Sequence, residues 1–221
     1  LSTADPSAAL SISYLLENAR RFDLSHGIPR RQLNRTGETR IDLSTRLAFY
    51  LAFPPAFDAE FRAAAETQGF DPLLLMSLAR EESAFDPEVR SWAGAIGLVQ
   101  LMPATAQAMA TQLKLGKVST AELMRPERNA ALGGKYLGNL LEMFDGHPGL
   151  AIPGYNAGEG AVQKWVRQRG ALPFDEWVEE IPYKQTRDYT RRVLGTYQTY
   201  QYLYRPKAPF LRIPLELALK R

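Results

Sequence analysis

The chain has 221 residues, of which 45% are hydrophobic and 23% are charged, a balance typical of a soluble globular protein with one well-buried domain and an appendage. A formal net charge of +3, spread along the chain, is too small to indicate a nucleic-acid partner. No run of about eighteen apolar residues is present, so no transmembrane segment is predicted. The sequence lacks cysteine, and its two histidines, His26 and His147, are far apart, so neither a metal site nor a cofactor is expected.

Residues 1–54 are expected to form an N-terminal helical arm or linker. Apolar residues at helical spacing predict a helix that ends near Phe22. Breakers then interrupt a basic stretch, and a further helical segment ends at two consecutive prolines. The residues that mark these interruptions are Gly27, Pro29, Gly37, Pro54 and Pro55. Because the chain begins with Leu1 rather than an initiator methionine, we also expect it to lie within a longer, processed protein.

The rest of the chain is predicted to be helical as well. The expected helices cover residues 56–68, 72–84, 103–113, 130–144, 161–169, 174–180 and 186–204, with Asn129 as a cap and a glycine-rich turn over residues 153–160. No segment alternates between apolar and polar residues as a half-buried strand does. The sequence therefore predicts a mainly α protein, with a C-terminal tail over residues 206–221 that has no legible function.

Glu82 is the first candidate for chemistry. On a helical wheel of about 100° per residue it lies in the middle of the apolar side of its helix, whereas Glu81 lies at the edge and Ser77 and Arg80 lie opposite. Burial raises the pKa of a carboxyl group, and a general acid that works near neutral pH needs a raised pKa. The alternative is a structural glutamate, paired with an arginine or bonded to a backbone amide.

A loop rich in small residues follows this helix, from Ser91 to Gln100, and Pro103 begins the next helix. Its sequence is SWAGAIGLVQ, and its two glycines allow the backbone to approach a ligand closely. Further along, residues 153–160 read PGYNAGEG, and residues 181–187 read IPYKQTR.

These segments carry a resemblance to a known family. The pattern E-S-A-F followed by S-x-A-G-A-x-G-L-x-Q-L-M-P-x-T-A resembles the core motif of the soluble lytic transglycosylases, which are lysozyme-like enzymes. YNAG and IPYKQTR are similar to that family's second and third motifs and occur in the same order. The resemblance implies a lysozyme-like α-helical catalytic domain over residues 55–205, and an arm similar to the end of an upstream helical superhelix.

The resemblance also implies an activity, a substrate and a location. Such enzymes cleave the β-1,4 bond between MurNAc and GlcNAc in peptidoglycan without water and leave 1,6-anhydro-MurNAc ends. One glutamate, here Glu82, acts as acid and then as base, with neither metal nor cofactor. Most glycoside hydrolases need two carboxylates, and the sequence offers no evident second one. The implied location is the periplasm or cell envelope of a bacterium, and the implied partners are peptidoglycan strands, with other cell-wall enzymes left open.

Eight further residues match the family's substrate-binding positions: Ser91, Gly97, Gln100, Met102, Tyr155, Asn156, Gln185 and Tyr189. The resemblance implies that Tyr155 places its hydroxyl near the catalytic carboxyl; the alternative is a buried tyrosine bonded to a backbone carbonyl. Asn156 is expected to hold its turn, and Tyr189 to lie either in the core or beside the substrate. For Ser91, Gly97, Gln100 and Met102, the alternative to substrate binding is a purely structural role in packing the loop and helix.

Two positions depart from the family pattern. Val99 stands where methionine is usual, and Gln185 replaces a glutamate of the third motif, which puts substrate preference in doubt. Two other functions stay open. A goose-type lysozyme would use the same glutamate to activate water, and a non-catalytic domain would bind peptidoglycan without turnover.

Overall fold

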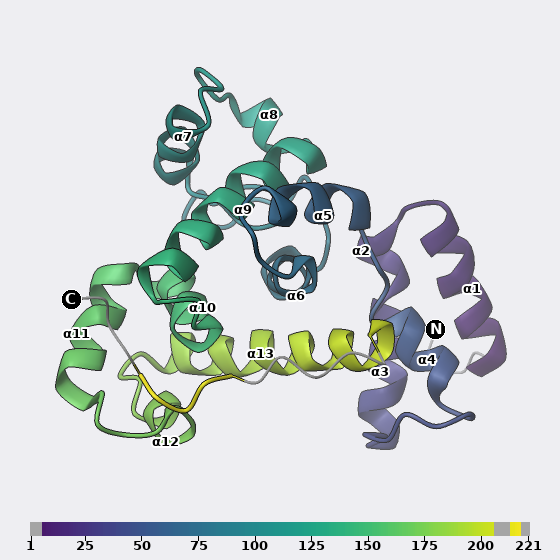
Figure 1. Ribbon diagram of the computed structural model, residues 1–221. Coiled ribbons are helices and arrows are strands. Elements are labelled where there is room, and N and C mark those ends of the chain that lie inside the picture. Colours follow the sequence, from purple (N-terminus) through teal and green to yellow (C-terminus); the bar gives the residue numbers. More distant parts are fainter. Residues whose placement is uncertain (1–5, 206–212, 218–221) are drawn as a thin grey trace.

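The computed structural model describes residues 6–205 and 213–217. Within these ranges the chain forms thirteen helices and no strand (Figure 1). Their bounds are α1 Pro6–Asn18, α2 Phe22–Ser25, α3 Gly27–Thr36, α4 Arg46–Ala52, α5 Asp58–Glu66, α6 Pro72–Ser83, α7 Pro103–Gln112, α8 Thr120–Leu123, α9 Pro126–Met143, α10 Pro148–Ala157, α11 Glu159–Arg169, α12 Phe174–Glu179 and α13 Lys184–Tyr204. The prediction of a mainly α protein is confirmed.

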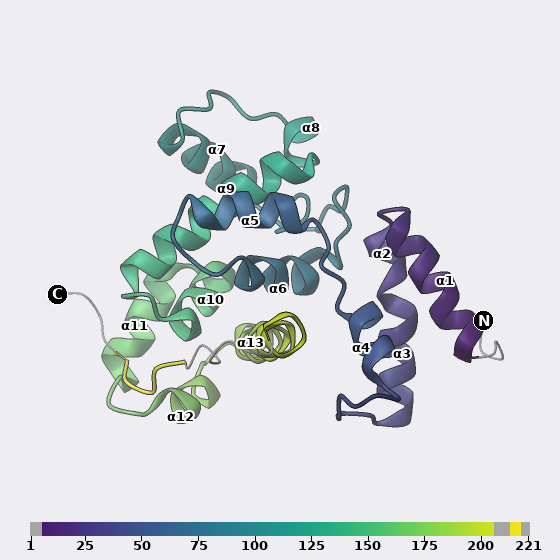
Figure 2. The same cartoon turned by 45° about the vertical axis from the view of Figure 1, so that its right-hand side comes forward.

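Helix α6 lies at the centre of the molecule. Asp71 caps it by accepting a hydrogen bond from the backbone N–H of Leu73, and Pro72 occupies the first helical position, where no N–H is needed. Figure 1 shows α6 end-on, with α5 and α9 on one side and the long helix α13 on the other, and α6 contacts all three. Figure 2 shows α6 from the side and α13 end-on.

Helix α6 is buried on more sides than the one apolar side that the sequence predicts. Every residue from Pro72 to Arg80 is buried, including Ser77 and Arg80, which the wheel places on the polar side. Ser77 satisfies its hydroxyl by donating to the carbonyl of Leu73. Arg80 donates to the carbonyl of Ala52 and lies over the ring of Phe53, so its charge is buried with partners.

Helices α1–α4 lie together on one side of the molecule (Figure 2). A separate small cluster of buried apolar residues joins them to the C-terminal end of α13: Leu33, Ala48, Phe49, Ala52 and Leu203. The division at residues 54 and 205 stays a prediction. Of the predicted tail, residues 206–212 and 218–221 lie outside the described residues; in the described part, the carbonyl of Leu215 accepts a hydrogen bond from the N–H of Phe174.

Three local predictions are wrong. The basic stretch with Gly27 and Pro29 is helix α3, because Pro29 lies in its first turn, where a missing N–H costs nothing. The tract 153–160 is helical up to Ala157, with Pro153 inside α10, and the turn comes only at Gly158. Asn129 does not cap α9, which begins earlier, at Pro126.

No helix in the described ranges is both long enough and apolar enough to cross a membrane.

Candidate active site

Glu82 is the next-to-last residue of α6 and faces α13. Its carboxyl oxygen accepts a hydrogen bond of 2.7 Å from the hydroxyl of Tyr189. Burial raises the pKa of Glu82 from an ordinary value of 4.5 to about 7, although the hydroxyl of Tyr189 and the charge of Arg192 act in the opposite direction. Glu82 is only partly exposed. Near neutral pH a large share of the molecules therefore carry the proton on this carboxyl group, as a general acid requires.

The backbone directly after Glu82 is strained. Ala84 and Phe85 both have positive φ angles, of 52° and 64°, in the left-handed region that residues with a Cβ rarely adopt. Such strain costs about 1–3 kcal/mol per residue and is found mainly at functional sites. Here it ends α6 abruptly, since the N–H of Ala84 still bonds to the carbonyl of Arg80, and it directs the chain into the loop that follows.

Glu81, although adjacent to Glu82, has a different environment. Its side chain is 5% exposed and is bonded to Arg80 at 2.9 Å and to Thr196 at 2.8 Å. Arg192 lies 3.4 Å from its second oxygen and Arg30 lies 4.0 Å from it. A carboxylate held by so many cations is not available as a nucleophile or base. Glu81, the neighbouring carboxyl group in the described part of the chain, thus does not act as a second free carboxylate beside Glu82.

The loop from Ser91 to Leu101 is fixed to α6 and to α9. The hydroxyl of Ser83 donates to the carbonyl of Leu98 at 2.7 Å. The buried side chain of Asn129 accepts from the N–H of Val99 at 2.9 Å and donates to the carbonyls of Ile96 and Leu123 at 3.0 and 2.8 Å. All three hydrogen bonds are buried, so this amide sets the position of the loop.

Two glycines permit this close packing. A Cβ on Gly97, whose φ is +80°, would lie 2.4 Å from the carbonyl oxygen of Leu123 and 2.5 Å from the amide of Asn129. A Cβ on Gly133, inside α9, would lie 2.3 Å from a methyl carbon of Val99. Gly97, predicted to line the substrate site, therefore serves first to let the loop approach α9.

Both tyrosine hydroxyls lie close enough to Glu82 to be affected by its charge, but they have different hydrogen-bond partners. The hydroxyl of Tyr155 donates to the carbonyl of Val99 at 2.9 Å, the alternative that the sequence left open. Tyr189 instead bonds Glu82 directly, from a position that is 3% exposed. Burial and the nearby charge of Glu82 raise the pKa of both hydroxyls well above the ordinary value, so both stay protonated.

The other predicted site residues fall into two groups. Ser91, Gln100 and Asn156 make hydrogen bonds within the protein: Ser91 accepts from the N–H of Ala95, Gln100 donates to the carbonyls of Val89 and Gly97, and Asn156 accepts from the hydroxyl of Thr186. Met102 and Gln185 are exposed. Asn156 thus ties α10 to α13, whereas the sequence predicted that it holds a turn.

Sequence reasoning missed several residues that build this site. Ser83 and Asn129 position the loop, and Arg192 affects the pKa of Glu82. Trp92, next to Ser91, is 100% exposed although it is a large aromatic residue. A tryptophan within a loop rich in small residues is the one signal among these that the sequence alone offers.

Within the ranges that the structure describes, no three histidine or acidic side chains gather as ligands of a metal ion would. Helices surround a central helix whose last turn carries one available carboxyl group, that of Glu82, with a pKa raised to about 7. This arrangement is that of the lysozyme-like superfamily.

Comparison with known proteins identifies the family. The profile of the transglycosylase SLT domain matches residues 59–178, more than half of the chain, and the chain belongs to this family. The soluble lytic murein transglycosylase of Escherichia coli is 34% identical over 152 residues, which are 68% of this chain and 24% of the relative.

Two solved structures have a similar fold. The 70 kDa soluble lytic transglycosylase of Escherichia coli superposes with a TM-score of 0.74 at 29% identity, over 86% of this chain and 29% of that one. An inactive glutamate-to-glutamine variant of the lytic transglycosylase Slt from Pseudomonas aeruginosa also gives a TM-score of 0.74 at 29% identity, over 92% of this chain and 32% of that one. The chain spans only about a quarter of the length of the curated relatives that it matches over most of its own length.

Proposed function

We propose that this protein is a peptidoglycan lytic transglycosylase that cleaves the β-1,4 bond between MurNAc and GlcNAc without water. The observation that carries the proposal is the position of Glu82, bonded to Tyr189 and with a pKa that burial raises to about 7, together with the absence of a second available carboxyl group beside it in the described residues. The names of the relatives, which describe lytic murein transglycosylases, support the same reaction.

The reaction then proceeds in two steps at one carboxyl group. Glu82 first donates its proton to the glycosidic oxygen, so that GlcNAc leaves and positive charge develops at C1 of MurNAc. The N-acetyl group of the substrate stabilises this centre, in place of the second carboxylate of ordinary glycosidases. Glu82, now a carboxylate, removes the proton from the C6 hydroxyl, whose oxygen bonds to C1 and closes the 1,6-anhydro ring. The proton is thereby returned to Glu82.

Tyr189 serves both steps through one hydrogen bond. Its hydroxyl stabilises the carboxylate form of Glu82, because it donates at 2.7 Å. Burial favours the protonated form, and the two effects together hold the pKa near the working pH. Ser91, Gly97, Gln100, Met102, Tyr155, Asn156 and Gln185 are proposed as substrate-binding residues. Those with hydrogen bonds inside the protein shape the loop and the helices, while the exposed Met102 and Gln185 are free to touch the substrate.

A peptidoglycan substrate places the enzyme in the periplasm or cell envelope of a bacterium. Gln185 lies exposed at the second position of α13, where the family's third motif carries a glutamate. A neutral amide there removes one negative charge from the substrate side, so we propose a different preference for peptide stems, with the same chemistry at Glu82. We also propose other cell-wall enzymes as partners.

The test compares the wild type with Glu82→Gln on purified, insoluble peptidoglycan. The glutamine keeps the shape and the hydrogen bond to Tyr189 but has no proton to give. We expect the wild type to release soluble anhydro-muropeptides, and the variant to release none while its melting temperature stays close to that of the wild type.

Other results would assign other functions. Release of muropeptides with free reducing ends would make the protein a lysozyme. Binding to peptidoglycan without release by the wild type, even at high protein concentration, would make it a binding domain. Full activity of Glu82→Gln would show that Glu82 is not the acid.

A further inference from the structure

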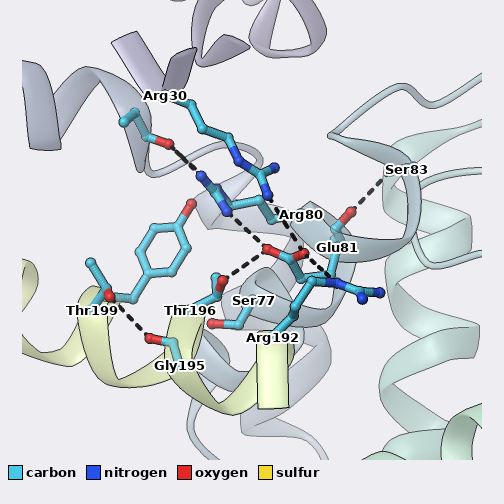
Figure 3. Close-up of polar contacts among 12 residues, drawn as sticks. Arg30, Ser77, Arg80, Glu81, Ser83, Arg192, Gly195, Thr196 and Thr199 are labelled. Carbon is cyan, nitrogen blue, oxygen red and sulfur yellow. Dashed lines mark hydrogen bonds and ion pairs between the residues drawn. The ribbon is translucent and has the colours of Figure 1, made fainter. Parts of the chain in front are cut away.

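A second buried carboxyl group lies directly before the catalytic one. Figure 3 shows the carboxylate of Glu81 among the guanidinium groups of Arg30, Arg80 and Arg192, with the hydroxyl of Thr196 donating to it. Consecutive residues on a helix point about 100° apart. Glu81 and Glu82 therefore reach different parts of α13, although they share one helix end.

One arginine lies between the two carboxyl groups. Tyr189, which bonds Glu82, and Thr196, which bonds Glu81, are seven residues apart on α13 and so share one helix face. Arg192 occupies the same face between them, three residues after Tyr189. Its Nε lies 3.4 Å from Glu81, and its positive charge also lowers the pKa of Glu82.

Little besides Glu81 holds the guanidinium group of Arg192. The side chain of Arg192 is 51% exposed, and it lines a pocket of about 310 Å³ between α3, α4 and α13. Its ion pair with Glu81 is the polar contact that fixes it in the described structure. Without that contact, the long side chain of Arg192 could turn to Glu82, whose carboxyl group meets α13 at Tyr189. Asp188, one turn earlier on α13, is another carboxylate whose pKa the charge of Arg192 lowers.

We propose that Glu81 is a positioning residue: its carboxylate holds the guanidinium group of Arg192 away from Glu82, so that Glu82 keeps its proton for the role of acid. This inference rests on the proposed function. The titratable or charged groups that face Glu82 are Tyr189 and Arg192 on α13, Tyr155 on α10 and Glu81 on α6. Among them Arg192 is the only cation, and Glu81 is the anion that opposes it.

The test is an NMR titration of isotope-labelled glutamate side chains in the whole chain, with the signal of Glu82 assigned by its absence in Glu82→Gln. An opposite charge that comes within contact distance lowers a carboxyl pKa by about 1–3 units. We therefore expect Glu81→Gln to lower the pKa of Glu82 by about one unit or more. Arg192→Gln should raise it, and the double variant should bring it back near the wild-type value.

A matched control removes a different arginine from the same carboxylate. Arg30, on α3, lies 4.0 Å from Glu81 and is 41% exposed, and it is not among the charges that affect Glu82. Arg30→Gln should change the pKa of Glu82 by less than half as much as Glu81→Gln does. The pH dependence of lytic activity should follow the pKa of Glu82. The decline of activity at alkaline pH should move to lower pH in Glu81→Gln and return to its wild-type position in the double variant.

An unchanged pKa of Glu82 in Glu81→Gln, or a double variant that stays shifted like the single one, would overturn the proposal. If Glu81→Gln does not fold, Arg192→Gln becomes the test, because the side chain of Arg192 is 51% exposed and its replacement should leave the fold intact. An unchanged pKa of Glu82 in Arg192→Gln would refute the role of Arg192. Because the titration needs no substrate, its outcome is separate from the proposed function. A wild type that releases no product would overturn that function and leave the titration result standing.

Discussion

Replacement of Tyr189 by phenylalanine tests how the pKa of Glu82 is set. The ring is 3% exposed and stays in place in Tyr189→Phe, which removes only the hydroxyl that donates to Glu82 at 2.7 Å. A hydrogen bond to a charged group contributes about 1.5–3 kcal/mol, and one pKa unit corresponds to about 1.36 kcal/mol. Since the hydroxyl favours the carboxylate form, its loss should raise the pKa of Glu82 from about 7 by about one to two units.

Two measurements check this expectation. NMR titration of labelled glutamates gives the pKa of Glu82 directly. The pH dependence of muropeptide release reports the same pKa during catalysis. Because the acid must be protonated, the decline of activity at alkaline pH should move upward by about one to two pH units in Tyr189→Phe. The maximal rate should also fall, since the carboxylate that accepts the proton in the second step has lost its stabilising donor.

Tyr155→Phe is the matched control. It removes a hydroxyl from a second buried tyrosine near Glu82, but that hydroxyl donates to the carbonyl of Val99. The pKa of Glu82 should therefore change much less than in Tyr189→Phe. A pKa that stays the same or falls in Tyr189→Phe, or that rises equally in both variants, would refute the role assigned to the hydrogen bond from Tyr189.

Three further predictions concern stability and binding. Burial lowers the pKa of His26 from 6.5 to about 4, so the free energy of unfolding should decrease by about 3 kcal/mol as the pH falls from 6.5 to 4. His26→Asn should make the free energy of unfolding less dependent on pH in denaturant titrations over this range. Asn129→Ala removes three buried hydrogen bonds and leaves the N–H of Val99 without its partner, so it should cost about 2–4 kcal/mol in urea unfolding. Asn139→Ala, partly exposed on the same helix, should cost less than about 1 kcal/mol, and equal losses would contradict the role of the buried amide. Trp92→Ala should leave the melting temperature unchanged, because the ring is 100% exposed, yet raise the KM for glycan strands several-fold; an unaltered KM would exclude Trp92 from substrate binding.

The sequence predicted the central helix and the position of Glu82 because both follow from local pattern. A capping aspartate, a proline at the first helical position and an apolar repeat determine the helix, and a carboxylate on its apolar side stands out. The sequence could not predict which tyrosine bonds Glu82. That choice depends on where α10 and α13 cross α6, and Tyr189 follows Glu82 by 107 residues.

Local rules failed where packing outweighed them. Glycines and Pro153 predicted a turn, yet α10 continues to Ala157, since its residues up to Gly154 are buried against the core. Burial of Arg80 was hidden for a similar reason, because its partners come from α4 and from its own helix neighbour. The positive-φ backbone at Ala84 and Phe85 also has no signature in residue type, as neither residue favours that conformation.

The most direct test of the account is digestion of purified peptidoglycan in water enriched in the heavy oxygen isotope, followed by mass spectrometry of the released muropeptides. If Glu82 first donates a proton and then removes one from the C6 hydroxyl, the MurNAc ends carry no heavy oxygen and are lighter by one water than hydrolytic products. Glu82→Gln should release neither kind. Incorporation of heavy oxygen at the MurNAc ends by the wild type would contradict the account, because a water molecule rather than the C6 hydroxyl would then have attacked C1.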